Sequence, residues 1–484
     1  MGSRRLALAG GLLAALIAAA PASAHHRLTV NRALGASGTA ATDGDAATTW
    51  CGTSLSLDLG RARRITGAGL TLDQDAAATT ARLKTSRGRT TRIAGTPGAP
   101  AYVRLHGRIT TARLTFDQPT CVGELRLFGP RRTRMALGAD ISFTRQEEQA
   151  GTVFTDNGRP GRVERILAHH GANYIRLRLW VNPPPGYSDL ANDLAMARRI
   201  KAAGERLYLD IHYSDFWADP QHQDTPAAWQ DQDLPTLANT VESYTRDTLR
   251  AFARQGTPVD MVSIGNEIRN GILWPVGHLD WTPQSWNALG TLLKAGVTGA
   301  KEADPHVRIM LHYDQGGDNG GSRAFFDNIV AQHVPFDVIG LSYYPFWHGT
   351  VSALRNNLDD LAGRYGKDVM IAEHQYAWTF ANGDTTDNFF WDDPTGALLA
   401  NTRNYPVSPQ GQISLANDIL SALAAVPHHR GGGFFYWEPE WVPGVGWEPG
   451  AGTPNDNLTL FDFGGAALPS IRLFEDPVNQ ASRR

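Results

Sequence analysis

The sequence predicts two modules, a small all-β sandwich over residues 25–130 and an α/β domain with a (β/α)8 barrel over residues 136–480. Three observations predict this organisation. The length of 484 residues exceeds that of one ordinary domain. Short apolar–polar alternation fills the first module, whereas apolar runs alternate with amphipathic stretches in the second. Eight apolar runs in a domain of this size favour a TIM barrel.

Residues 1–24 have the pattern of a signal peptide. Two arginines at positions 4 and 5 precede an apolar run over residues 6–20, and the sequence ASA at 22–24 offers a small-x-small cleavage site. The paired arginines leave both the general secretory route and the twin-arginine route open. We therefore expect a secreted, extracellular protein whose mature chain begins near residue 25.

Composition excludes several classes of partner. The net charge of -3 provides no basic field that would attract nucleic acid. No stretch after the signal peptide holds enough consecutive apolar residues to cross a membrane, so no membrane partner is expected. Secretion makes Cys51 and Cys121 expected disulfide partners. Closing a loop of about 70 residues would stabilise the module by about 4 kcal/mol.

The first module consists of short alternating segments such as SLSLDLG and TARLTF, separated by Gly, Pro and Asp. The runs DGDAATTWCG and CVGELRLFG are similar to those of the discoidin or coagulation-factor type C domain, a galactose-binding-like jelly roll. The resemblance implies an accessory module that binds carbohydrate. A packed appendage without a ligand is the alternative, because this fold alone does not specify binding.

In the second module, amphipathic segments such as residues 189–204 and 285–303 carry apolar residues at helical spacing. They separate eight expected strands, which are residues 135–142, 173–180, 205–213, 260–267, 307–314, 336–344, 368–374 and 432–439. The carboxyl ends of barrel strands face the active site. These ends are more polar than a core requires: Asp140, Arg176, Arg178, Asp210, His212, Asn266, Glu267, His312, Asp314, Tyr343, Tyr344, Glu373 and Trp437.

Two glutamates occupy strand ends that a barrel brings across its mouth. Glu267 ends the fourth expected strand, and Glu373 ends the seventh. Glycoside hydrolysis needs such a pair, one carboxyl group that protonates the leaving oxygen and one carboxylate that attacks the anomeric carbon. A buried structural ion pair with an arginine is the alternative for either glutamate alone.

The second module resembles glycoside hydrolase family 53, the endo-β-1,4-galactanases of clan A. The resemblance rests on the segments RLRLWVNP, LDIHYSDFWADPQHQDTPAAW, GNEIRNGILWP, LHYDQGGDN, GLSYYPFWHG and GGGFFYWEPEW. It implies that Glu267 is the acid/base and Glu373 the nucleophile of a retaining mechanism. It further implies that Asn266 donates to the sugar 2-hydroxyl and that Trp437 forms a platform under the sugar.

The same resemblance implies a plant-type galactan or arabinogalactan substrate and no cofactor for the chemistry. We expect a monomer. We expect the further substrate-binding residues to be Asp140, Arg176, His212, His312, Asp314, Tyr343 and Trp347. His212 and the arginines of RLRLW could equally hold the glutamates in place. His374 departs from the family, which usually has a small residue after the nucleophile; alternation along the strand predicts that its ring packs outward.

A loop after Glu373 has the spacing of a cation site. Asn382, Asp384, Thr386 and Asn388 place oxygen-bearing side chains at every second residue, which lets a turn surround a hard cation. The family resemblance implies a structural calcium ion held here against the loop that contains Asp456. Asn382 and Thr386 replace the usual aspartate and histidine, so weak binding is expected, and a polar loop without an ion is the alternative.

Two other functions stay open. Another clan A endo-glycanase acting on mannan, xylan or glucan would share the chemistry of the two glutamates. A non-catalytic carbohydrate-binding protein would not need a paired acid and nucleophile. The histidine pairs His169-His170 and His428-His429 are interpreted as surface loops, because no Cys or closely spaced carboxylate accompanies them in the sequence.

Overall fold

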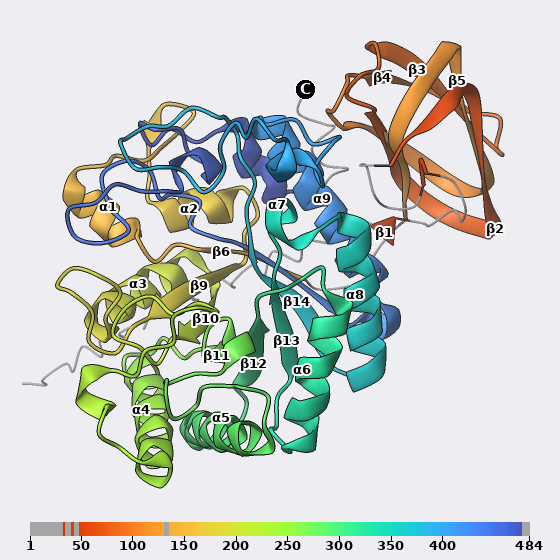
Figure 1. Ribbon diagram of the computed structural model, residues 1–484. Helices are drawn as coiled ribbons and strands as arrows, with labels where there is room; N and C mark the ends of the chain where they lie inside the picture. The colour runs from red at the N-terminus through yellow and green to blue at the C-terminus, as the bar shows by residue number, and fades with distance from the viewer. Residues whose placement is uncertain (1–31, 34–39, 43–47, 130–134, 477–484) are drawn as a thin grey trace, which may run out of the picture.

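The computed structural model describes residues 32–33, 40–42, 48–129 and 135–476. The predicted signal peptide and the arginine-rich connector at 131–134 lie outside these residues. Figure 1 shows a small β module beside a larger body in which helices surround a central set of strands. This arrangement confirms the predicted fold class of a β module followed by a (β/α)8 barrel.

The β module is built around two long, bent strands. Its strands are β1 (Arg32–Ala33), β2 (Trp50–Leu72), β3 (Thr79–Thr85), β4 (Thr90–Gly95) and β5 (Ala101–Gly129). Gly67 of β2 pairs with both Arg104 and Phe128, so β5 folds back and contacts β2 along both edges. The predicted disulfide between Cys51 and Cys121 is confirmed and joins β2 to β5. Leucines at alternate positions fill the core, as the alternation predicts.

Eight parallel strands form a closed barrel, and all eight expected strands are confirmed. They are β6 (Ala136–Asp140), β9 (Tyr174–Leu179), β10 (Arg206–Ile211), β11 (Met261–Ile264), β12 (Arg308–Tyr313), β13 (Val338–Ser342), β14 (Asp368–His374) and β15 (Gly431–Tyr436). A two-stranded hairpin of β7 (Thr155–Asp156) and β8 (Arg159–Pro160) lies outside the barrel sheet.

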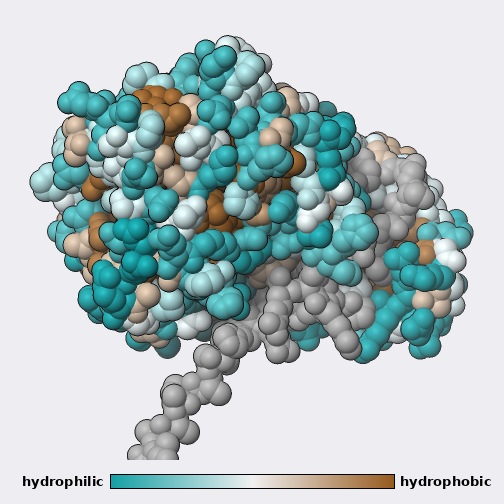
Figure 2. All heavy atoms as spheres, turned by 90° about the horizontal axis from the view of Figure 1, so that it is seen from below, coloured by the Kyte–Doolittle hydropathy of each residue, from teal (hydrophilic) through white to brown (hydrophobic). Residues whose placement is uncertain are grey.

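Helices cover the barrel, and polar caps define where several of them begin. Asp189 accepts a hydrogen bond from the backbone N–H of Asn192 at the start of α3, which ends at a left-handed Gly204. The helices are α1 (Thr144–Ala150), α2 (Val163–His169), α3 (Leu190–Ala203), α4 (Leu234–Arg254), α5 (Pro283–Ala303), α6 (Asn319–Ala331), α7 (Pro345–His348), α8 (Val351–Tyr365) and α9 (Pro409–Ala425). Among the described residues, none of the helices combines the length and apolar character needed to cross a membrane. Hydrophilic residues dominate the face in Figure 2, with hydrophobic ones in small groups between them.

The barrel interior changes from apolar to polar along the strands. Tyr174 near the start of β9 belongs to an apolar layer with Tyr208, Met261, Met310 and Phe435. Further along β9, Arg176 and Arg178 line the cleft at the mouth, whereas Ile175 and Leu177 pack in the large core cluster. The period of two along β9 therefore directs both arginines into the barrel interior, at the end of the strand that faces the cleft.

The β module packs on the outer helix layer through polar contacts with α9. Arg126 forms a buried ion pair with Asp418, to which the Tyr405 hydroxyl also donates at 2.6 Å. Asn417 donates a hydrogen bond to the Tyr102 hydroxyl. Arg126 and Asp418 are therefore buried partners from different modules, at the contact between the two modules.

Candidate active site

A cleft of about 490 Å³ lies at the carboxyl ends of the barrel strands. Both predicted catalytic glutamates line it, together with Arg176, Asn266 and Trp437. These residues come from β9, from the segments that follow β11 and β15, and from β14. The barrel therefore brings together side chains that are far apart in the sequence.

The turn after β11 explains the glycine that precedes Asn266 and Glu267. Gly265 has φ +86, and a Cβ atom there would lie 2.6 Å from Ile268 Cγ2. Both observations require glycine at this position. Glu267 itself has φ 49, a left-handed conformation that is strained for a residue with a side chain. The backbone thus turns sharply at the end of the strand and directs the Glu267 carboxyl group into the cleft.

An irregularity in β14 directs Glu373 into the cleft. Leu341 pairs with Ile371, but the next residue, Ser342, pairs with Glu373, so one residue of β14 is unpaired. Val369 and Ile371 pack in the outer core cluster, and simple alternation would place Glu373 with them. The extra residue instead turns Glu373 inward.

His374 packs outward, as predicted. Its Nδ1 lies 3.1 Å from the Tyr343 carbonyl oxygen, and its ring packs edge-on against Tyr436. Burial lowers the pKa of His374 to about 4, so its ring is neutral beside the core. The departure from the small residue that the family usually has here therefore adds no charge next to Glu373.

The two carboxyl groups are close together. One carboxylate oxygen of Glu267, one of Glu373 and a ring nitrogen of His312 lie within 4.8 Å of one another. Ser342 Oγ donates to Glu267 and lies 2.9 Å from His312 Nε2. Two carboxyl groups that lie this close can both reach one bond of a molecule bound in the cleft.

The surroundings of the two glutamates differ in charge. Burial raises the pKa of both carboxyl groups, and the charge of Glu373 raises that of Glu267 further, well above its usual value. Glu373 alone accepts from a guanidinium, Arg176 Nη2 at 2.8 Å, and from the Tyr344 hydroxyl at 2.8 Å. Both donors favour the ionised form of Glu373, whereas the charge of Glu373 favours the protonated form of Glu267.

Arg176 is the only guanidinium that contacts Glu373 among the described residues. It also forms ion pairs with Asp140, at 2.6 Å, and with Asp210, and donates to Asn266 Oδ1 at 2.9 Å. Burial alone would raise the pKa of Asp210, but Arg176 and His212 lower it. One buried cation thus contacts carboxylates from three strands.

Aromatic side chains form the wall of the cleft. Trp217 stacks on Trp447 with 4.2 Å between ring centroids, whereas the rings of Trp217 and Trp437 are inclined at 63°. Trp347 is 51% exposed at the rim. The guanidinium of Arg178 lies 4.4 Å from the Trp217 ring centroid and supports this wall from below.

Most of the predicted substrate-binding residues lie at the cleft. Six line it, namely Arg176, His212, Asn266, Asp314, Trp347 and Trp437. Asp140 and His312 are fully buried beneath it and act through Arg176 and Ser342. Because both residues are buried, they cannot contact the sugar as expected. They instead support residues that line the cleft or contact its glutamates.

Tyr343 requires a correction. Its side chain is fully buried and its hydroxyl donates to the Gly349 carbonyl, away from the cleft, while the neighbouring Tyr344 lines the cleft. The sequence of this strand could have identified Tyr344. Alternate residues of a strand face the same side, and Ser342, two residues before Tyr344, faces the interior and contacts Glu267.

Buried acidic residues next to the site were not predicted from the sequence. Glu438 accepts from Arg178 Nη1 at 2.7 Å, and burial raises its pKa to about 8. Burial likewise raises the pKa of Glu147 to about 9 and that of Glu440 well above its usual value. Glu440 accepts from the Thr144 hydroxyl at 2.8 Å. The segment WEPEW supplies two of these acids, yet its sequence does not reveal that both are buried.

The predicted calcium residues join two loops. Asp384 accepts from the backbone N–H groups of Thr386 and Thr453, and Asp456 accepts from that of Gly383. Asn382 Oδ1 likewise accepts from the Asp384 N–H.

Two oxygen atoms at the same place have no donor. Asp456 Oδ1 and Asn388 Oδ1 are buried and accept no hydrogen bond from the described residues. Carboxylate and amide oxygens are ligands that a hard cation prefers. Asp456 and Asn388 therefore fit the ion, whereas the oxygens of Asn382 and Asp384 already accept backbone hydrogen bonds.

Comparisons with known proteins find similarity along the barrel. The family model for glycosyl hydrolase family 53 matches residues 136–474. An uncharacterized protein of Niallia circulans is 42% identical over 342 residues, which cover 69% of this chain and 92% of that protein. An arabinogalactan endo-beta-1,4-galactanase of Thermothelomyces thermophilus is 35% identical over 347 residues, 70% of this chain and 98% of that protein.

Two solved structures are similar to about the same share of the chain. The GH53 catalytic domain of Ignisphaera aggregans has a TM-score of 0.66 and 35% identity, covering 71% of this chain and 99% of that domain. A structure from a study of two fungal beta-1,4-galactanases has a TM-score of 0.62 and 34% identity, with coverage of 71% and 99%.

Proposed function

The chain belongs to glycosyl hydrolase family 53 and is a glycoside hydrolase, and from this premise we propose that it is a secreted endo-β-1,4-galactanase that retains anomeric configuration. One observation carries the proposal. Carboxylate oxygens of Glu267 and Glu373 lie within 4.8 Å of each other in a cleft at the barrel mouth. A short separation of this kind favours direct attack by a carboxylate, because an inverting enzyme needs room for a water molecule between the two groups.

In the proposed first step, Glu267 gives its proton to the glycosidic oxygen while Glu373 attacks the anomeric carbon. The bond to the leaving sugar breaks, and a covalent glycosyl-enzyme forms. Glu267, now ionised, then removes a proton from water, which attacks the same carbon and releases Glu373. Two inversions give net retention. The raised pKa of Glu267 supports its role as the acid.

Other residues position these groups. Arg176 and the Tyr344 hydroxyl each donate to one oxygen of Glu373 and fix the plane of its carboxylate. Burial and the adjacent Glu373 charge raise the pKa of Tyr344 well above its usual value, so its hydroxyl stays protonated and donates. Asn266 is held by Arg176 and by the Ala218 carbonyl, which leaves one amide hydrogen for a sugar hydroxyl.

The substrate proposal rests on the shape of the cleft and on the names of the relatives. A β-1,4-linked galactan has axial linkages at O4, so its chain bends rather than lying flat. The inclined rings of Trp217 and Trp437 suit such a bent chain. Relatives named arabinogalactan endo-beta-1,4-galactanase support galactan or arabinogalactan as the polymer.

We expect the specificity constant on unbranched galactan to exceed that on mannan, xylan or cellulose by roughly 100-fold or more, because the polar groups of the cleft lose partners on the wrong sugar. Reducing-sugar release from each polymer, with product sizes at early times, measures this. Galactose as the sole early product would refute internal cleavage. Faster hydrolysis of mannan or xylan would favour the alternative of another clan A glycanase, and no hydrolysis of any polymer would favour a binding protein.

A structural calcium ion is part of the proposal. Asp456 and Asn388 would hold it, and it would tie the loop after β14 to the loop after β15. We expect EDTA to lower the melting temperature and calcium to restore it, since an ion that binds only the folded state stabilises that state. Asn388→Ala should remove this difference. An identical melting temperature with and without EDTA would exclude the ion.

The proposal also covers the β module, which would bind carbohydrate, and the signal peptide, which would direct secretion. The module's resemblance to discoidin-type domains supports a role in binding carbohydrate near the catalytic barrel. The disulfide between Cys51 and Cys121 suits an oxidising, extracellular environment and supports secretion.

A further inference from the structure

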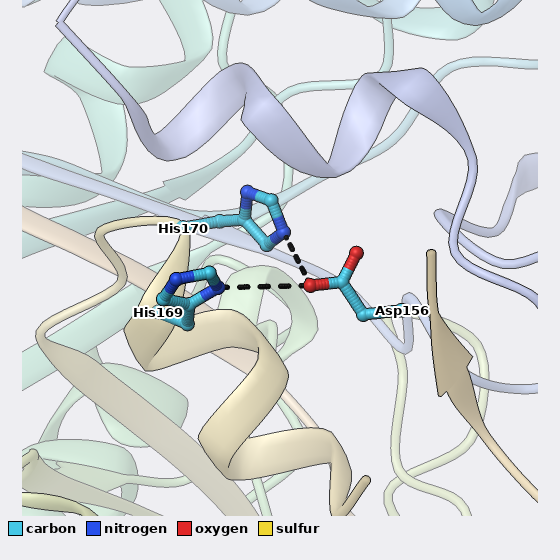
Figure 3. Close-up of side chains that lie close together, drawn as sticks. All are labelled: Asp156, His169 and His170. Carbon is cyan, nitrogen blue, oxygen red and sulfur yellow. Dashed lines mark hydrogen bonds and ion pairs between the residues drawn. The ribbon is translucent and has the colours of Figure 1, made fainter. Parts of the chain in front are cut away.

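A cluster of two histidines and one aspartate lies outside the cleft. His169 is the last residue of α2, His170 follows it, and Asp156 ends β7. His170 Nε2 lies 3.1 Å and His169 Nδ1 3.6 Å from the same oxygen, Asp156 Oδ2. Figure 3 shows both rings turned toward this oxygen. We propose that these three side chains bind a zinc ion.

The distances suit tetrahedral zinc. With zinc–ligand bonds of about 2.0 to 2.1 Å, neighbouring ligand atoms in a tetrahedron are roughly 3.4 Å apart. The two measured distances bracket that value, and all three ligand atoms lie within 4.8 Å of one another. Two imidazole nitrogens and one carboxylate oxygen favour zinc over calcium or magnesium, which prefer sets of oxygen ligands.

A second carboxylate orients one of the ligands. Glu475 Oε1 lies 3.4 Å from His170 Nδ1. When Nδ1 donates its proton to Glu475, Nε2 carries the lone pair that binds a metal. Both His170 and Glu475 are largely buried, with 7% and 12% of their side chains exposed. This pairing of carboxylate, histidine and metal site is the arrangement that fixes the orientation of ligating histidines.

The arrangement of the two rings also suits an ion. The centroids of the His169 and His170 rings are 5.2 Å apart, so one ion can reach a nitrogen of each ring. The positive charge of a bound zinc ion would lie next to the Asp156 carboxylate. The His169 side chain is 70% exposed, which leaves an entry path and a fourth position for water.

The ion would stabilise the fold and take no part in catalysis. His170 leads into β9, which starts at Tyr174, so the cluster lies at the amino ends of the strands, opposite the cleft. Zinc would connect α2 to the β7–β8 hairpin and, through Glu475, to the last described segment of the chain. Stability, and not activity, is therefore the property to measure.

The test uses the full mature chain without a polyhistidine tag. Bound metal ions are first removed with EDTA, and the protein is then kept in an excess of calcium. We expect titration calorimetry to show one zinc ion per chain and the melting temperature to rise by roughly 2 °C or more. His169→Asn should abolish both effects, because asparagine is a poor zinc ligand. The His169 side chain is exposed, so this substitution should leave the fold unchanged.

His429→Asn is the matched control. His428 and His429 also form an adjacent pair, but in the described part of the chain no carboxylate forms a cluster with them. Asparagine tolerates the left-handed backbone at position 429, where φ is 59. Zinc binding should be unchanged in this variant. Equal loss in both variants, or no binding by the parent protein, would refute the proposal.

The catalytic site provides a second, separate outcome. Glu267, His312 and Glu373 also converge within 4.8 Å and could take up added zinc. If binding persists in His169→Asn and disappears in Glu373→Ala, the ion occupies the catalytic cleft and the proposal fails. This result would leave the proposed galactanase activity untouched, because the activity assays contain no zinc.

Discussion

Replacement of Glu373 by alanine is expected to lower kcat on galactan by roughly 10⁴-fold or more, because no other group in the cleft is placed to attack the anomeric carbon. The fold should persist. Glu373 is one of three carboxylates around Arg176, so its removal relieves negative charge and leaves Asp140 and Asp210 paired. The measurement is turnover on galactan, with an unchanged or higher melting temperature as the control.

Azide separates the nucleophile from the acid. In Glu373→Ala, azide fits the vacated space, attacks the anomeric carbon and yields a product of inverted configuration. Glu267→Ala should instead keep the first step for aryl galactosides with good leaving groups, because these need no proton. Hydrolysis of galactan that survives Glu373→Ala, or azide products of inverted configuration in Glu267→Ala alone, would reverse or refute the assignment.

Arg176→Met is expected to lower the free energy of unfolding by about 3 to 5 kcal/mol, because it leaves Asp140, Asp210 and Glu373 buried without their cation. Activity should fall as well. Arg176 lowers the pKa of Glu373, so without it the nucleophile stays protonated to higher pH. The acid limb of the pH profile should therefore move to higher pH. Urea unfolding and the pH dependence of kcat measure the two effects.

Arg364→Met is the matched control for Arg176. Arg364 also pairs with an aspartate, Asp327, but both side chains are exposed to about 40%, at 38% and 44%. Solvent screens an exposed pair, so Arg364→Met should change the free energy of unfolding far less than Arg176→Met does. Adding Asp210→Asn to Arg176→Met should recover part of the lost stability, since it removes one of the unpaired buried charges. Equal losses of unfolding free energy in Arg176→Met and Arg364→Met would contradict the proposed role of Arg176 as the cation that stabilises the buried carboxylates.

Local patterns in the sequence were sufficient to predict the fold. Each barrel strand alternates between apolar residues that pack under the helices and residues that face the interior, and this period is visible in the sequence of one strand alone. The same period identified the polar ends of the strands. Family motifs then predicted Glu267 and Glu373 as the catalytic pair, and the family model that matches residues 136–474 confirms the family.

The direction of individual side chains at the site depended on neighbouring strands. Alternation along residues 368–374 alone places Glu373 on the same face as Val369 and Ile371. Only the pairing of β13 with β14 reveals the extra residue that turns Glu373 inward. Hydrogen-bond register between two strands is a property of the folded sheet, so neither strand shows it by itself.

The sequence by itself determined the two modules, the barrel, its polar mouth and the pair of glutamates, because each of these follows from periodicity or motifs within short segments. Only the tertiary structure decided which charged and titratable side chains contact one another. Arg176 reaches carboxylates from three strands, and His169 and His170 meet Asp156 and Glu475, although the sequence around the two histidines contains no carboxylate partner. The physical reason is that electrostatic partners are set by distances through space, and the packing of the whole chain brings His170 and Glu475 together although they lie 305 residues apart in the sequence.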